Sequence, residues 1–324
     1  MPPLHHSKHV RYNIGIDLMG SDNSPEALLA HAALLIPLLP SMARLIAVGL
    51  PHYEEQAKSL GLGFYSALQE IGMAEHPLSA LRKKKHSSLC VGLKHLKNGE
   101  LDAFVSAGNT GALVSAAKIM LGTFPGIQRP ALLALMPTKK RPVAVLDVGA
   151  NLQAKAAQLV QYARLGVAYQ KARGIENPRI GILNIGSEAS KGTSEVRLAY
   201  QELIKCPSFA GNIEGKSVFD GEVDVLLADG FTGNIFLKTA EGIASLVLDR
   251  LHAHISQETL QKLQLEDFQH HLHYAEYPGA LLCGVKKLVI KCHGYSTPQA
   301  FSNGIRGAVE FAMTHFLDIY HGYL

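Results

Sequence analysis

The chain has 324 residues, of which 47% are hydrophobic and 18% are charged, and its formal net charge is +4. This length allows one large α/β domain or two smaller ones with a sizeable core, and the small net charge gives no support for a nucleic-acid-binding protein. The four cysteines are far apart and form no C-x-x-C pair, so we expect reduced thiols in a cytoplasmic protein. No apolar run reaches the roughly 18 residues that span a bilayer.

Residues 1–11 contain histidines, prolines and a lysine but no apolar segment, and we expect a disordered N-terminal tail. Short apolar runs bounded by turn formers then predict strands, and longer stretches that begin at a capping residue predict helices. Ser24 followed by Pro25 is such a start. Up to residue 121 we expect strands at 12–16, 44–48 and 101–105, and helices at 25–39, 53–60, 89–96 and 112–121.

The second half continues the alternation. Expected strands are 129–135, 142–146, 179–185, 223–228 and 288–290, and expected helices are 159–173, one after Thr193, one after Asn234, and 298–320. The helix after Asn234 is apolar over a wide arc, which is typical of a helix in the core or one shared with another subunit. The pattern predicts a single α/β domain over 12–324, with three αβα layers, a mostly parallel sheet and a helical protrusion at about 245–275.

Several expected strands end in small polar loops that contain glycine. Such loops, at the carboxyl ends of parallel strands, can hold an anion on backbone N–H groups and helix N-termini. The alternative is a set of ordinary tight turns, with Asn109 and Asn151 as turn or N-cap residues. The candidate binding residues are Asp17, Gly20, Ser106, Gly108, Asn109, Thr110, Gly111, Asp147, Asn151, Gly186, Asp229 and Gly233, and two further polar side chains in these loops are Lys191 and Asn234.

Three familiar kinds of site fit poorly. The loop Gly186–Thr193 has Lys-Gly-Thr where a P-loop has Gly-Lys-Thr, and Gly294–Pro298 lacks the second glycine of a nucleophile elbow. Among the histidines between 252 and 273, those two residues apart would not share a helix face. No convergent set of Cys or Asp residues accompanies them, so we expect no metal. A reaction in which the substrate brings its own nucleophile, such as inorganic phosphate, suits the remaining residues.

Nine motifs, in order over about residues 12 to 312, resemble those of the bacterial phosphate acyltransferases, which make acyl phosphate from acyl-[acyl carrier protein] for phospholipid synthesis. These motifs are Ile14–Asp22, Ala80–Ser88, Ser106–Ala112, Arg129–Leu132, Asp147–Asn151, Leu183–Gly186 with Lys191–Gly192, Gly211–Gly215, Asp229–Asn234 and Val289–Gly294. The resemblance implies a fold related to phosphotransacetylases and isocitrate/isopropylmalate dehydrogenases. It also implies a cytoplasmic homodimer, sometimes at the membrane surface, that works with a glycerol-3-phosphate acyltransferase and without a cofactor.

The resemblance places Lys191 and Asn234 at the catalytic lysine and asparagine of the family, and His293 within a substrate-binding motif. Lys191 would neutralise phosphate or the developing oxyanion, and Asn234 would orient one of them. A basic run such as Arg82, Lys83, Lys84 and Lys85 is most often a solvated helix face; the alternative is a docking site for the acidic carrier protein or for the phosphate end of its prosthetic arm.

The chain departs from the family pattern at His86, Lys216–Ser217, Pro278 and Tyr295. The polar segment from His252 to His273 weighs against membrane docking more than against catalysis. Two alternatives to acyl transfer from the carrier protein stay open. One is a phosphotransacylase that uses acyl-CoA, and the other is a non-catalytic scaffold for lipid-synthesis enzymes.

Overall fold

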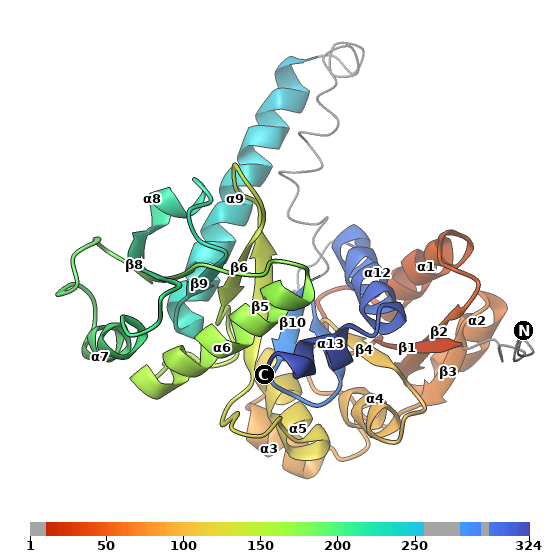
Figure 1. The fold of residues 1–324 in the computed structure, drawn as a ribbon. Helices are drawn as coiled ribbons and strands as arrows, with labels where there is room; N and C mark the ends of the chain where they lie inside the picture. Colours follow the sequence, from red (N-terminus) through yellow and green to blue (C-terminus); the bar gives the residue numbers. More distant parts are fainter. Residues whose placement is uncertain (1–10, 256–278, 293–297) are drawn as a thin grey trace, which may run out of the picture. The chain divides into compact units, whose positions relative to one another are not determined.

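The computed structural model describes residues 11–255, 279–292 and 298–324 (Figure 1). The chain falls into two compact units, one formed by Met1–Leu121 with Lys287–His315 and the other by Gly122–Lys286 with Phe316–Leu324. The single domain expected over 12–324 stays a prediction. Both units combine a sheet with covering helices, as the alternating pattern predicted.

The first unit contains a parallel sheet. Its strands are arranged in the order β3 (Gly63–Ser66), β2 (Ala43–Gly49), β1 (Tyr12–Asp17), β4 (Ala103–Ser106) and β11 (Leu288–Lys291). The central strands carry fully buried β-branched and aromatic side chains, among them Ile14, Ile16 and Phe104. Ile16 is in register with Val105, and Ser106 is in register with Lys291, so the carboxyl ends of β1, β4 and β11 lie at one edge.

Helices cover both faces of this sheet (Figure 1). On one face, α12 (Pro298–Met313) packs on β1, β4 and β11 and contacts α1 (Pro25–Leu35). On the other face, α4 (Ser88–Lys97) packs on β1, β2 and β4 and contacts α5 (Thr110–Leu121), which also contacts α3 (Pro77–Lys83). A short helix α2 (Glu54–Ser59) precedes β3. The 3₁₀ turns are η1 (Ile36–Leu38) and η2 (Pro51–Tyr53).

The second unit contains a mixed sheet in the order β10 (Ala280–Cys283), β5 (Ala131–Met136), β6 (Val143–Leu146), β9 (Val225–Leu227), β7 (Ile180–Asn184) and β8 (Phe209–Glu214). Strand β5 is antiparallel to both of its neighbours, whereas β6, β9, β7 and β8 run parallel. Its helices are α6 (Ala156–Ala172), α7 (Ser194–Leu203), α8 (Gly215–Val218), α9 (Gly230–His254) and α13 (Phe316–Gly322).

Helix α6 packs on β6 and β9 and contacts α7 and α13, while α9 packs on β6. At Gly166 of α6, a Cβ would lie 2.4 Å from the side chain of Val225, so glycine allows the helix to approach the sheet. Figure 1 shows the C-terminal half of α9 extending past the strands of this unit. Helix α9 continues to His254, and residues 256–278 lie outside the described residues, so the predicted protrusion at about 245–275 stays a prediction.

The structure differs from the sequence-based expectations in several elements. Strands β3, β8 and β10 and helices α3 and α8 were not expected; each is short. The closing helix expected over 298–320 is two helices, because His315 takes a left-handed backbone conformation with φ 51°. The strand expected to be buried through Ile185 ends at Asn184, and Ile185 itself is 83% exposed.

Candidate active site

In the second unit, three of the predicted polar loops begin at one edge of the sheet. Leu227 at the end of β9 is in register with Leu146 on β6 and with Ile182 on β7, and all three strands run parallel. The loops that follow these strands contain Asp147 and Asn151 after β6, Gly186 and Lys191 after β7, and Asp229, Gly233 and Asn234 after β9. The topology thus brings together the predicted residues of this unit at the carboxyl edge of its parallel strands.

Asp147 is a fully buried carboxylate that organises the loop after β6. Its oxygens accept hydrogen bonds at 2.7–3.1 Å from the backbone N–H groups of Leu132, Gly149, Ala150 and Asn151 and from the side-chain amide of Asn151. Burial raises the pKa of Asp147, and these hydrogen bonds act in the opposite direction. All of these donors come from the protein itself, so the carboxylate serves here to fix the loop.

Asn151 is equally committed to the loop. Its side-chain amide nitrogen also donates to the carbonyl oxygen of Pro130 at 2.8 Å, and its backbone carbonyl oxygen accepts from the N–H of Gly230 at 2.8 Å. The turn and capping interpretation fits these contacts. A direct contact of Asp147 or Asn151 with phosphate stays a prediction.

Helix α9 begins directly against this loop. Asp229 is the N-cap, because its carboxylate accepts a hydrogen bond from the N–H of Thr232 at 2.7 Å. A Cβ at Gly230 would lie 2.5 Å from the Asn151 carbonyl oxygen, and one at Gly233 would lie 2.0 Å from the Asp147 carbonyl oxygen. Only glycine permits this approach. This close approach places Asn234 beside the loop after β6, since a Cβ at Gly149 in that loop would lie 3.8 Å from the Asn234 amide oxygen.

Lys191 lies in a loop that is held by other side chains. The amide of Asn184 donates to the Lys191 carbonyl oxygen at 3.2 Å, and the amide of Asn212 donates to the Glu188 carbonyl oxygen at 2.8 Å. The Lys191 ammonium lies 3.9 Å from the Glu188 carboxylate, and its side chain is 47% exposed. At Gly186 a Cβ would lie 2.7 Å from the Glu188 carboxylate, so glycine there leaves room for this loop to fold back.

In the first unit, a buried charge network lies at the carboxyl ends of β1, β4 and β11. Asp17 accepts a hydrogen bond from the Ser106 hydroxyl at 2.8 Å and from the N–H of Met19 at 3.2 Å. Burial raises the pKa of Asp17 to about 6, while hydrogen bonds from Ser88 and Ser106 and the charge of Lys291 act to lower it. The Lys291 ammonium donates to the carbonyl oxygens of Ala107 and Cys292.

Asn109 is the N-terminal cap of α5 and also holds a neighbouring loop. Its amide oxygen accepts from the N–H of Ala112 at 3.0 Å, and its amide nitrogen lies within 3.3 Å of the carbonyl oxygens of Gly72, Met73 and Glu75. These contacts match the capping interpretation.

The glycines beside Asn109 allow close packing within this unit. The N–H of Gly108 donates to the Ser106 hydroxyl at 3.1 Å, and Thr110 opens α5. A Cβ at Gly111 would lie 2.5 Å from the Pro77 side chain, and one at Gly20, where φ is 71°, would lie 2.4 Å from the Ile71 carbonyl oxygen. The anion-binding role proposed for these positions stays a prediction.

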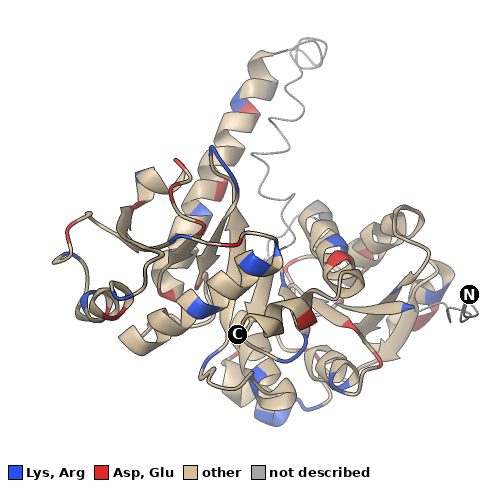
Figure 2. Ribbon diagram, viewed as in Figure 1, with Lys and Arg blue, Asp and Glu red and all other residues tan. Residues whose placement is uncertain are grey.

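The basic run forms the end of α3 and the turn after it. Lys84 is half-buried and pairs with Glu75 at 2.6 Å, whereas Arg82, Lys83 and Lys85 are exposed and form no ion pair with any residue that the structure describes. Figure 2 shows basic residues concentrated on this helix. Most of the run is therefore the solvated face that the sequence favoured, with three positive charges available to a partner.

The buried charge network of the first unit includes two residues that were not predicted as site residues, Ser88 and Lys291. Lys291 stands at the end of an apolar strand, and only the pairing of β11 with β4 reveals that it is buried beside Ser106.

His293 and Tyr295 lie outside the described residues. Within the described part of the chain, no three His, Cys, Asp or Glu side chains gather into a possible metal site. No helix in that part is long and apolar enough to cross a membrane.

The chain is similar in sequence and in fold to known proteins. Over residues 12–318 the chain matches a family described as "Fatty acid synthesis protein". The Phosphate acyltransferase of Chlamydia pneumoniae is 41% identical over 316 residues, which cover 92% of this chain and 95% of that protein. The Phosphate acyltransferase of Thermotoga petrophila (strain ATCC BAA-488 / DSM 13995 / JCM 10881 / RKU-1) is 41% identical over 308 residues, which cover 92% and 90%.

Among solved structures, the EutD phosphotransacetylase from Staphylococcus aureus is similar, with a TM-score of 0.59, 16% sequence identity and 94% of each chain covered. At this identity the likeness concerns the fold alone. It confirms the predicted α/β class and the predicted relationship to phosphotransacetylase folds.

Proposed function

Since this chain belongs to the fatty acid synthesis protein family, we propose that it transfers a fatty acyl group from acyl-[acyl carrier protein] to inorganic phosphate. Membership of the family and the relatives named phosphate acyltransferase make the chain an acyltransferase that acts on phosphate. The carrier protein as donor, and a glycerol-3-phosphate acyltransferase as consumer of the acyl phosphate, are the proposed part.

The observation that carries the proposed site is a contrast between side chains at one sheet edge. Asp147 and Asn151 are buried and saturated with protein hydrogen bonds. The Asn234 side chain makes no hydrogen bond to another residue of the described chain, and the Lys191 ammonium has only an exposed carboxylate 3.9 Å away. An ammonium and an amide that the fold does not use are therefore available to a ligand at the edge where α/β enzymes bind theirs.

The proposed reaction begins with phosphate held near Lys191 and the N-terminus of α9. A phosphate oxygen attacks the thioester carbonyl carbon, and the carbonyl oxygen becomes an oxyanion in the tetrahedral intermediate. The C–S bond then breaks, the electron pair leaves on the carrier protein sulfur, and the proton of hydrogen phosphate passes to that thiolate. The products are acyl phosphate and the free thiol of the carrier protein.

Lys191 supplies positive charge for phosphate or for the oxyanion, and Asn234 supplies a hydrogen-bond donor, as preorganised dipoles and charges do in acyl-transfer enzymes. In the proposed site, the N–H groups at the start of α9 add to the same field. For Asp17, Ser106, Gly108, Gly111 and His293, a role in substrate binding is a separate proposal.

The test is an assay with purified protein, phosphate and either palmitoyl-[acyl carrier protein] or palmitoyl-CoA, with acyl phosphate trapped by hydroxylamine. We expect acyl hydroxamate, together with one free thiol per product, and a higher kcat/KM with the carrier protein. Preference for palmitoyl-CoA would identify the rival phosphotransacylase. Absence of product with both donors, combined with co-sedimentation of the protein with liposomes, would favour the scaffold.

The exposed apolar stripe of α9 supports a proposed homodimer. Phe231, Ile235 and Leu246 share one face of the helix and are 60%, 50% and 53% exposed. An apolar stripe of this kind is typical of a helix shared between subunits. We propose that the protein is cytoplasmic and makes peripheral contacts with the membrane surface. Sedimentation equilibrium of the protein and of Ile235→Lys tests the dimer, and a monomeric wild type would reject it.

A further inference from the structure

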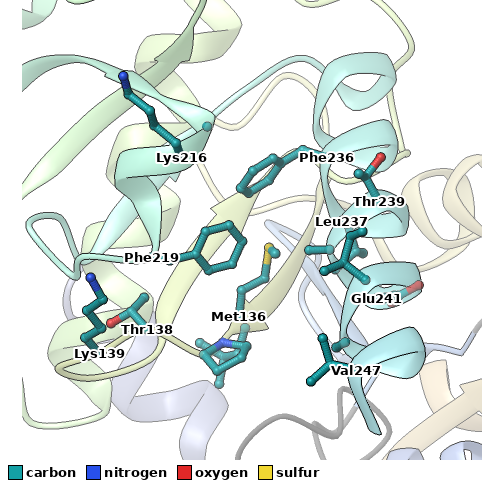
Figure 3. A pocket seen from close by; sticks show the side chains of 16 residues that line it. Met136, Thr138, Lys139, Lys216, Phe219, Phe236, Leu237, Thr239, Glu241 and Val247 are labelled. Atoms are coloured by element: carbon teal, nitrogen blue, oxygen red, sulfur yellow. The ribbon is translucent and has the colours of Figure 1, made fainter. Parts of the chain in front are cut away.

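The second unit contains a cavity of about 690 Å³ whose walls are mostly apolar (Figure 3). Figure 3 shows Met136, Phe219 and Phe236 pointing toward one another, with Leu237 and Val247 on the facing side of α9. The rings of Phe219 and Phe236 lie 5.8 Å apart. Sites for small organic molecules are typically concave, mostly apolar and about 300–1,000 Å³ in volume.

The cavity reaches from the proposed active edge of the sheet to its opposite edge. Gly215 follows Glu214, which is in register with Asn184 at the carboxyl end of β7, so this part of the lining lies at the active edge. Met136 is in register with Val143, the first residue of β6, so this part lies at the amino edge. The cavity therefore runs along the parallel strands.

Helix α9 links the cavity to Asn234. Positions three and seven residues further along a helix lie on nearly the same face; for Asn234 these are Leu237 and Glu241, and both line the cavity. From Phe236 to Val247 the helix rises about 16 Å, which gives the lining the length of an extended alkyl chain. Lys139 and Lys216 extend away from the interior (Figure 3).

We propose that this cavity binds the hydrocarbon chain of the acyl donor, with the thioester near Asn234 and the chain end near Val247. The inference rests on the proposed function, because it assigns a site to one part of that substrate. An apolar channel beside a polar reaction edge suits this occupant, since burial of the methylene groups of an alkyl chain is favourable, whereas the carbonyl needs the polar groups.

Two substitutions test the direction of the chain. Ala240 and Ala244 line the cavity and lie about 6 Å apart along the helix axis. In Ala244→Phe we expect kcat/KM for palmitoyl-[acyl carrier protein] to fall by at least about tenfold, while that for octanoyl-[acyl carrier protein] changes little. In Ala240→Phe we expect kcat/KM for the octanoyl donor to fall as well. Ser245→Phe, at an exposed neighbouring position outside the lining, is the matched control and should keep the wild-type profile.

A second measurement does not depend on turnover. An acyl-[acyl carrier protein] with a diazirine at the chain end should cross-link to residues 136–139 or 243–247, and the cross-links should be lost in Ala244→Phe. Cross-links elsewhere would overturn the proposal. So would variants that lower kcat/KM equally for the palmitoyl and octanoyl donors, or that leave the chain-length profile unchanged. A wild-type protein that yields no acyl phosphate from any donor, yet cross-links in the cavity, would instead refute the proposed function.

Discussion

Gly233 packs so closely on Asp147 that a Cβ at position 233 would lie 2.0 Å from the Asp147 carbonyl oxygen. This approach joins the start of α9 to the loop after β6, and it fixes the position of Asn234 within the second unit. The loop itself is held by the buried Asp147 carboxylate. The backbone contact therefore links a structural carboxylate to a proposed catalytic amide.

Gly233→Ala is expected to displace the start of α9 and to lower kcat by about 100-fold, since a displacement of about 1 Å in an active site has effects of that size. We also expect a loss of about 2 kcal/mol in the free energy of unfolding. Gly242→Ala in the same helix is the control, because a Cβ there has no atom within 4 Å. It should leave kcat unchanged and stabilise the protein slightly. Urea unfolding measures the free energy of unfolding of each variant, and acyl phosphate assays measure kcat. A near-normal kcat in Gly233→Ala would argue against this geometry.

Asp17 is expected to make stability depend on pH. Burial raises its pKa from 3.8 to about 6, so the folded protein binds this proton more tightly than the unfolded chain. The resulting contribution to stability is fully present below about pH 3.8 and is lost as the pH rises to about 6.

Asn does not titrate, so Asp17→Asn should remove this dependence. Between pH 4 and pH 6.5 we expect the variant to gain up to about 3 kcal/mol in the free energy of unfolding relative to wild type. Urea titrations of both proteins across this range provide the measurement. Parallel pH profiles would show that Asp17 titrates normally in the folded protein.

The exposed basic residues of the 82–85 run are expected to steer the acidic carrier protein. Replacement of Arg82, Lys83 and Lys85 together by Ala should raise KM for acyl-[acyl carrier protein] several-fold and flatten its dependence on ionic strength, because exposed charges act over about 10 Å at 0.1 M salt. Lys84→Ala is the control within the same run, since Lys84 is already paired with Glu75. It should leave KM unchanged and cost no more than about 1 kcal/mol of stability. Equal KM and salt dependence in the triple variant and wild type would reject the docking site.

Sequence patterns identified the elements that have a strong local signal. The strand at Tyr12–Asp17 and the helix that begins at Pro25 after the Ser24 cap lie where they were expected. The four-residue strand β10 was missed because so short a run resembles a loop or part of a helix. The break at His315 was missed because no glycine or proline marks it.

The candidate site was predictable as a set of loops but not as a set of roles. Glycine-bearing loops after strands indicated where polar groups gather. The sequence could not show that the amides of Asn109 and Asn151 are used by the fold, because their partners, such as Gly72 and Pro130, are distant in the chain. Lys291 was missed for the same reason, since its burial depends on the pairing of β11 with β4.

Lys191 is proposed to supply positive charge to the phosphate or to the oxyanion. Its side chain is half exposed, so Lys191→Ala should keep the unfolding midpoint of wild type. The control is Lys205→Ala, another exposed lysine paired with a nearby carboxylate in the same unit.

The most direct measurement is the rate of acyl phosphate formation by the folded Lys191→Ala protein at saturating acyl-[acyl carrier protein] and phosphate. We predict a loss of about 100-fold or more, as expected when one preorganised group that stabilises transition-state charge is removed, and no loss in Lys205→Ala. Turnover of Lys191→Ala within twofold of wild type would show that Lys191 does not supply this charge.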